Sequence, residues 1–260
     1  MKKLWILGFA SALLVLSSAG ARASLIDDWD TAPQGTLQKL LGVDTYTTGN
    51  DFLRTRVTVA GNSAANPFRF GPAGLQTPGV TKTIFSGGTT RSNLSTVVLF
   101  KPTGSSSILY TINFFGFKQG VKDVNFTLFD VDANTHGSVN GSVNVEEVVT
   151  FLTAGLTLTG SKDNVVSGNT VTGISTAPNT GPGSADGNVT VKSGNIPLHQ
   201  IVFTFGTLPA GINALAGFGI SNISFTPVPE VGQLAIGLIA CLIGGLWLRK
   251  NRRQRASSIA

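Results

Sequence analysis

Hydrophobic residues follow two patterns along this chain: long apolar runs stand near both ends, and short alternating runs fill the middle. The alternation is clear where Val124, Phe126 and Leu128 are separated by Asn125 and Thr127. A period of two places the three apolar side chains on one face of an extended strand and the polar ones on the other. The middle of the chain is therefore predicted to form half-buried β-strands.

Further runs of this kind are separated by dense glycine, proline and asparagine turn signals. The predicted strands are 96–100, 108–114, 124–129, 143–151, 189–191, 201–205 and 220–225. Only residues 37–41 show a short period of about 3.6 residues, and residues 175–187 are low in complexity and predicted to be an exposed loop. We therefore predict an all-β fold, an antiparallel β-sandwich of jelly-roll type, over residues 24–226.

The N-terminal apolar run has the three parts of a secretory signal peptide. Lys2 and Lys3 precede the run, and Ala21 and Ala23 follow it in an A-x-A arrangement. Small side chains at these two positions fit the shallow pockets of signal peptidase. Residues 1–23 are predicted to pass through the Sec translocon and to be cleaved before Ser24; an uncleaved anchor is the alternative.

The C-terminal apolar run, residues 231–248, contains no charged residue. As a helix it would be about 27 Å long at roughly 1.5 Å per residue, close to the thickness of the hydrocarbon core of a bilayer. A basic segment, 249–255, follows it directly and contains Arg249, Lys250, Arg252, Arg253 and Arg255. Basic residues stay on the cytoplasmic side of a span, so residues 24–226 are predicted to lie outside the cytoplasm.

The net charge of +6 comes from the two ends of the chain. Residues 24–228 carry 11 basic and 12 acidic residues and are nearly neutral, which argues against a nucleic-acid partner. The single cysteine, Cys241, lies inside the C-terminal apolar run, so the middle domain has no disulfide bond. A domain of this size buries enough apolar surface to fold without one.

Residues 227–260 resemble the PEP-CTERM sorting domain, which combines a Pro-Glu-Pro motif, a membrane helix and an arginine-rich end. Here Pro229 and Glu230 match the first two motif positions, whereas Val231 stands at the third. The resemblance implies an exported protein of a Gram-negative, biofilm-forming bacterium, whose tail is recognised by an exosortase-like sorting enzyme in the membrane. An ordinary tail anchor with a proline-rich stalk is the alternative interpretation.

The best candidate site follows the predicted strand that ends at Phe129. Asp130, Asp132 and Asn134 alternate in a D-x-D-x-N pattern, which presents several oxygen ligands toward one point when a loop curls, as Ca²⁺ requires. The EF-hand pattern is not met. Two alternatives stay open: Asx turns that cap the strand, and a zinc site through His136.

Signs of catalysis are weak in the middle domain. It holds only His136 and His199, no cysteine and no G-x-S-x-G motif. Glu146 and Glu147 are adjacent in a predicted strand, so their side chains face opposite ways and do not form a glycosidase pair. We predict no catalytic residue and no cofactor apart from the candidate Ca²⁺.

These observations predict a non-enzymatic protein of the cell surface or extracellular matrix, membrane-anchored before its tail is processed. The alternative is a Ca²⁺-dependent module that binds carbohydrate or exopolysaccharide. An extracellular hydrolase is the third interpretation.

Overall fold

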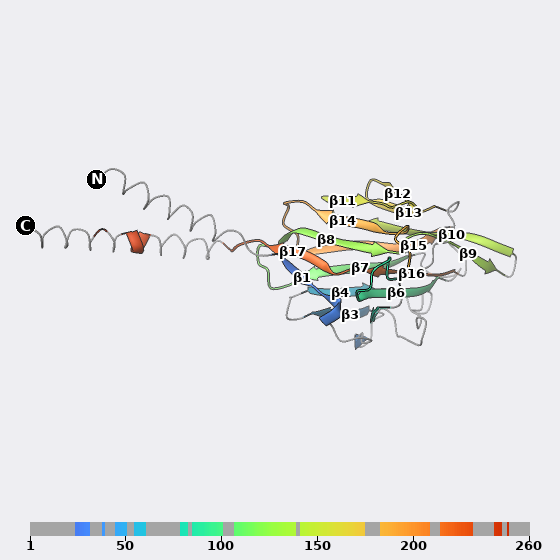
Figure 1. Cartoon of the computed structure of the whole chain (residues 1–260), viewed down its shortest axis with the longest axis horizontal. Coiled ribbons are helices and arrows are strands. Elements are labelled where there is room, and N and C mark those ends of the chain that lie inside the picture. The colour runs from blue at the N-terminus through green and yellow to red at the C-terminus, as the bar shows by residue number, and fades with distance from the viewer. Residues whose placement is uncertain are drawn as a thin grey trace, which may run out of the picture. The chain divides into compact units, whose positions relative to one another are not determined.

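The structure, a computed structural model, describes most of the β-rich middle of the chain and little of its ends (Figure 1). The described residues are 24–31, 38–39, 45–50, 55–60, 79–82, 85–100, 107–138, 141–174, 183–208, 214–230, 242–245 and 249. The chain divides into two units: Ser24–Thr226 forms one, and Met1–Ala23 with Pro227–Ala260 forms the other.

Two sheets make up the first unit. Sheet A has eight strands, and β8 lies near its centre. In spatial order it contains β1 (Leu25–Asp27), β17 (Ile223–Pro227), β8 (Val121–Phe129), β16 (Ala214–Ile220), β6 (Asn93–Phe100) and β5 (Gly79–Thr81), with β14 (Val189–Ser193) beside β8 and β11 (Leu156–Thr159) beside β14.

Sheet B has nine strands. In spatial order it contains β12 (Asn164–Ser167), β13 (Thr170–Gly173), β10 (Gly141–Phe151), β15 (Gln200–Leu208), β7 (Ser107–Phe114), β4 (Thr55–Ala60), β3 (Thr45–Asn50) and β2 (Gln38–Lys39), with β9 (Ala133–Ser138) beside β10. From β6 to β16 the chain alternates between the two sheets, with the hairpins β9–β10 and β12–β13 each taken as one step.

The predicted fold class is confirmed at the level of two antiparallel sheets, and the predicted strands between residues 96 and 205 lie within β6, β7, β8, β10, β14 and β15. Two details differ. The predicted strand 220–225 is interrupted, because β16 ends at Ile220 and β17 begins at Ile223. Of the residues 37–41 with a short helical period, the described Gln38 and Lys39 form strand β2 opposite Thr47 and Tyr46.

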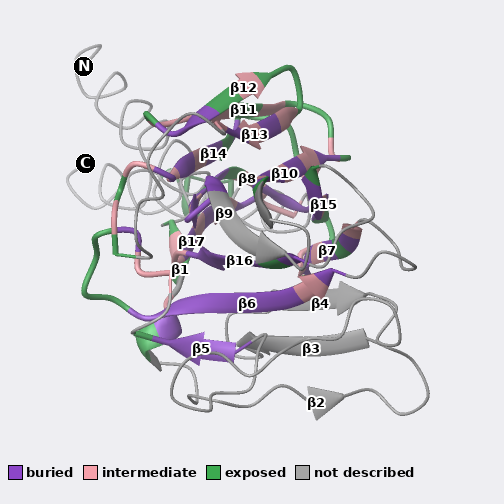
Figure 2. Ribbon diagram, turned by 90° about the vertical axis from the view of Figure 1, so that its right-hand side faces the viewer, coloured by how far each residue is buried: buried purple, intermediate pink, exposed green. Residues whose placement is uncertain are grey.

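Aromatic side chains fill the space between the sheets, where the ribbon is buried along most of its length (Figure 2). Tyr110 and Phe203, from neighbouring strands of sheet B, stack with their ring centroids 4.9 Å apart. Phe218 of sheet A meets the Tyr110 ring edge-on, also at 4.9 Å. These three side chains are fully buried, so aromatic rings from both sheets form the middle of the core.

The N-terminal segment binds at residues 221–222, where the strand is interrupted between β16 and β17. This segment contains the short 3-10 helix η1 (Trp29–Thr31). Trp29 is fully buried there, and its Nε1 donates a hydrogen bond to the Ser221 carbonyl at 2.8 Å. The Trp29 backbone N–H donates to Asn222 Oδ1 at 3.0 Å. Next to it, hydrogen bonds from Ser92 lower the pKa of Asp30, with a smaller contribution from Lys82. The N-terminal segment is thus part of the core of the domain.

The two ends of the first unit lie side by side, because β1 pairs with β17. Leu25 is opposite Phe225, and the Ser24 hydroxyl donates to the Phe225 carbonyl. We call this end of the domain the exit end. It also carries the turns 115–120, 152–155 and 194–199, which are joined to the strand ends by the Val121–Leu198 bridge and by the Leu152 N–H to Val202 carbonyl bond.

Replacement of Trp29 is expected to destabilise the domain, because this side chain fills the break between β16 and β17. Trp29→Ala should lower the free energy of unfolding by about 3–5 kcal/mol, and Trp29→Phe by about 1–2 kcal/mol, since it leaves the half-buried Ser221 carbonyl without its donor. Urea unfolding of residues 24–230, followed by circular dichroism, measures both. Ile26→Ala is the control, because Ile26 is 53% exposed; an equal loss in that variant would contradict the assigned role of Trp29.

Candidate functional site

The candidate site lies where the chain passes from β8 in sheet A to β9 in sheet B. Only Asp130, Val131 and Asp132 make this connection. Asp130 has φ of 64°, in the left-handed region that Asp and Asn tolerate better than most residues. The Val131 N–H donates to the Gly187 carbonyl at 2.9 Å, and the Val131 carbonyl accepts from Asn164 Nδ2 at 3.3 Å. A backbone bond to Gly187 and a side-chain bond from Asn164 therefore hold this connection in place.

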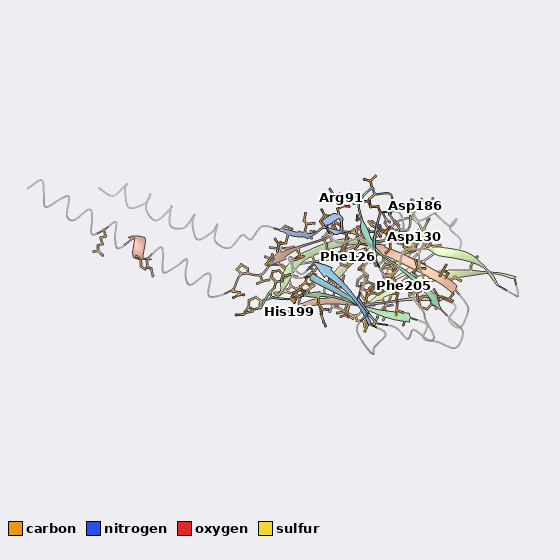
Figure 3. All side chains as sticks on the ribbon, turned by 90° about the horizontal axis from the view of Figure 1, so that it is seen from below. Arg91, Phe126, Asp130, Asp186, His199 and Phe205 are labelled. Atoms are coloured by element: carbon orange, nitrogen blue, oxygen red, sulfur yellow. The ribbon has the colours of Figure 1, made fainter. Side chains whose placement is uncertain are left out.

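Two glycines permit the close approach of these backbones. A Cβ on Gly173, in β13, would lie 1.9 Å from the Asp132 carbonyl oxygen, and one on Gly187 would lie 3.2 Å from the Asp130 Cα. A side chain at Gly173 would thus displace the connection. Asp186, the residue before Gly187, lies beside Asp130 in Figure 3, toward the end of the domain away from His199.

Glu147 of β10 joins the two aspartates from the opposite sheet. Its Oε1 accepts a hydrogen bond from the Gly217 N–H of β16 at 3.0 Å, and its Oε2 accepts from the Asp132 N–H at 3.5 Å. The Glu147 N–H in turn donates to the Asp132 carbonyl at 2.9 Å. Because β8 pairs with β16 only at Gly219 and Ile220, Glu147 supplies an acceptor that the neighbouring strand does not provide at Gly217.

These three carboxyl groups, the acid cluster, are shielded from solvent: Asp130 is 7% exposed, and Asp132 and Glu147 are 1% exposed each. Burial, with a smaller contribution from the nearby Asp132, raises the pKa of Asp130 to about 8. Burial also raises the pKa of Glu147 well above its usual range, as do Asp130 and Asp132, against the opposing hydrogen bonds from Gly217 and Asp132. The cluster therefore holds protons at neutral pH.

The structure brings two of the three predicted site residues together. Asp130 and Asp132 converge with Glu147, whereas Asn134 lies in β9, where it pairs with Val145 of β10. The expected curled loop is therefore replaced by a short connection and a strand. Among the described residues, no group of three or more His, Cys, Asp or Glu side chains is arranged to hold a metal ion. The Ca²⁺ assignment stays a prediction.

Sequence reasoning missed Glu147 as a site residue, although it predicted correctly that Glu146 and Glu147 face opposite ways. Glu147 is buried, while Glu146 is partly exposed. The available signal in the sequence was an acidic residue at an inward position of a strand whose other inward residues are apolar. His199 is exposed at the exit end, far from the acid cluster, and His136 lies in β9 opposite Val143.

The predicted processing and membrane residues lie largely beyond the described part of the chain. Pro229 and Glu230 are described, half-buried and without regular structure. Of the predicted span 231–248, residues 242–245 are described and helical, as is Arg249. No helix within the described ranges is long and apolar enough to cross a membrane. Outside the described residues lie Ala21, Ala23, Lys250, Arg252, Arg253 and Arg255.

Comparison of the sequence with protein-family models and with curated proteins finds no match. The resemblance of the C-terminal tail to a sorting domain therefore stays a prediction carried by its own residues.

The acid cluster can hold protons, but a large substrate cannot reach its carboxyl groups. A polysaccharide has no access to side chains of 1% exposure unless the β8–β9 connection moves. A general acid or nucleophile must come within hydrogen-bond reach of its substrate. The geometry instead gives the carboxyl groups a structural role, in which Glu147 links sheet B to an N–H of sheet A.

The acid cluster predicts that the domain loses stability as pH rises. A carboxyl group with a raised pKa stays protonated when folded but ionises when unfolded, so its contribution is complete below about pH 4 and is lost by about pH 8 for Asp130. We expect a decline of at most about 1.4 kcal/mol per pH unit and per carboxyl group. Urea unfolding at several pH values should show a shallower decline for Asp130→Asn, which retains the shape and the left-handed backbone. Equal slopes in both proteins would contradict the assignment.

Thermal unfolding at the same pH values, with and without millimolar Ca²⁺, tests the predicted cation site. An ion held by Asp130 and Asp132 replaces the protons, so it should raise the melting temperature near pH 8 and have little effect near pH 4. The Asp130→Asn variant should lose this response. An unchanged melting temperature at every pH would contradict the predicted Ca²⁺ site and the calcium-dependent binding function that depends on it.

Proposed function

We propose that this chain is a non-enzymatic exported protein of the bacterial cell surface or extracellular matrix. In this proposal, residues 1–23 are removed by signal peptidase after transfer through the Sec translocon. The helix 231–248 then holds the protein in the membrane, and an exosortase-like enzyme acts on the tail at Pro229 and Glu230. Residues 24–226 are the mature domain, for which we retain the jelly-roll assignment.

One observation carries this proposal: the core begins and ends at the predicted processing sites. The Ser24 hydroxyl already bonds to Phe225, and Trp29 is fully buried. The last strand ends at Pro227, two residues before the motif. Cleavage after Ala23 therefore leaves the domain intact, because every strand described in the Ser24–Thr226 unit starts after that bond.

The alternation of consecutive strands between the two sheets supports the jelly-roll subtype, a double-sheet architecture common in surface-exposed domains. Burial of the acid cluster favours a structural role over a hydrolase or an open sugar-binding site. Leu242 and Ile243 are 66% and 61% exposed on their helical turn, as expected of side chains that face lipid.

Cell fractionation with two epitope tags tests the proposal. One tag is inserted between residues 175 and 182 of the predicted loop 175–187, and the other is placed at the C-terminus, since a tag at Ser24 would disturb β1. We expect the loop tag outside the cell membrane on a chain that begins at Ser24, separated from the C-terminal tag. The double variant Pro229→Ala/Glu230→Gln should keep both tags on one membrane-bound chain, whereas Thr226→Ser should be processed normally.

Two results would contradict separate parts of the proposal. If both tags stay on one full-length chain in the parent protein, the C-terminal segment is only a membrane anchor and the proposed sorting step is wrong. A loop tag that external protease cannot reach in spheroplasts would remove export itself.

A further inference from the structure

Three apolar side chains are exposed at the exit end, one on each of three separate connections. Leu152, after β10, and Ile196, between β14 and β15, are each 58% exposed. Phe115, directly after β7, is 36% exposed. A single exposed apolar residue is common on soluble proteins, but a group on the same end of a domain indicates a surface that meets another apolar phase.

Strand order places these three side chains close together. In sheet B, β15 lies between β10 and β7. Strands β10 and β7 end at the exit end while β15 begins there, so Leu152 and Phe115 are separated by two strand spacings, roughly 10 Å. Ile196 lies in the loop that leads into β15, and its Cδ1 is 3.2 Å from the position of a Cβ on Gly155. The Phe114 N–H to His199 carbonyl bond ties this loop to the end of β7.

Lysines flank the exposed apolar side chains of the exit end. Among the described residues, the elements that reach this end carry Arg56, Lys118, Lys122 and Lys192 together with Asp27, Asp123 and Glu230. Lys122 Nζ donates to Asn195 Oδ1 at 2.8 Å, which holds one ammonium group beside the Ile196 loop. The opposite end of β8, roughly 27 Å away, carries the aspartates Asp130, Asp132, Asp163 and Asp186 together with Lys162.

The chain leaves this same end toward the predicted membrane helix through a very short segment. β17 ends at Pro227, and the predicted span begins at residue 231. Even fully extended, four residues reach no more than roughly 14 Å. The headgroup layer of a bilayer is itself roughly 5–8 Å deep on each side, so Pro227 at the exit end stays within roughly 9 Å of that layer once the helix is inserted.

We propose that the exit end is a bilayer-contacting surface. Phe115, Leu152 and Ile196 enter the headgroup region, and the flanking lysines contact the phosphates of anionic lipids. This orients the domain with its β8–β9 connection away from the membrane. The inference rests on the proposed membrane anchor, and it adds a direct contact of the folded domain with lipid.

The test uses the full chain in vesicles of phosphatidylethanolamine and phosphatidylglycerol. In a Cys241→Ser background, Ile196→Cys and Leu152→Cys each carry an environment-sensitive fluorophore. Leu208→Cys is the matched control: Leu208 is 46% exposed, and it lies at the far end of β15, eight residues from Gln200. We expect a blue shift and a several-fold rise in emission at positions 196 and 152, quenched by brominated lipids, and no change at position 208.

Further arms separate the possible outcomes. Lys118→Glu/Lys122→Glu should reduce the shift in anionic vesicles. Fluorophores that stay in water on a chain resistant to alkaline extraction would overturn the lipid contact while the anchor stands. A chain that alkali removes would overturn the anchor first. A shift that grows with the protein-to-lipid ratio and resists brominated lipids would assign the surface to a second copy of the chain, which also overturns the proposal.

Discussion

The pairing of β1 with β17 is the constraint on which the rest of this structure depends. It covers the edge of β17, places Trp29 in the break between β16 and β17, and brings both ends of the domain together. When the chain is held at that place, the exit end of the domain faces the point of attachment. The opposite end, with the β8–β9 connection, is then the part farthest from the tether.

The acid cluster at that far end is best explained by packing. Where β8 turns away from β16, the Gly217 N–H needs an acceptor, because an unsatisfied buried N–H costs about 1–3 kcal/mol. Glu147 provides this acceptor from the other sheet. Burial and, to a smaller extent, the proximity of Asp130 and Asp132 raise the pKa of Glu147, so the connection is most stable when protonated. A link between the sheets is thereby coupled to pH.

Much of the fold was predictable because period-two alternation reports directly on a two-sided strand. Val124, Phe126 and Leu128 are predicted to share a face and are all buried in β8. The break at Ser221 was not predictable, since it depends on Trp29, some 190 positions away in sequence. The position of Glu147 beside Asp130 likewise depends on the register between sheets, and Asn134 is drawn into β9 by its pairing with Val145. Local patterns carry no information about such contacts.

The most direct test of this account is a disulfide bond between β1 and β17. Ile26 and Ser224 are opposite each other, at a separation that a cross-strand disulfide can span, and in a Cys241→Ser background no other cysteine competes. In growing cells, Ile26→Cys/Ser224→Cys should form the bond on the cleaved chain, because only an exported domain meets oxidising conditions. Ile26→Cys/Thr226→Cys, two residues out of register, should not form it. A folded Ile26→Cys/Ser224→Cys chain that keeps both thiols reduced in the cell would contradict the account.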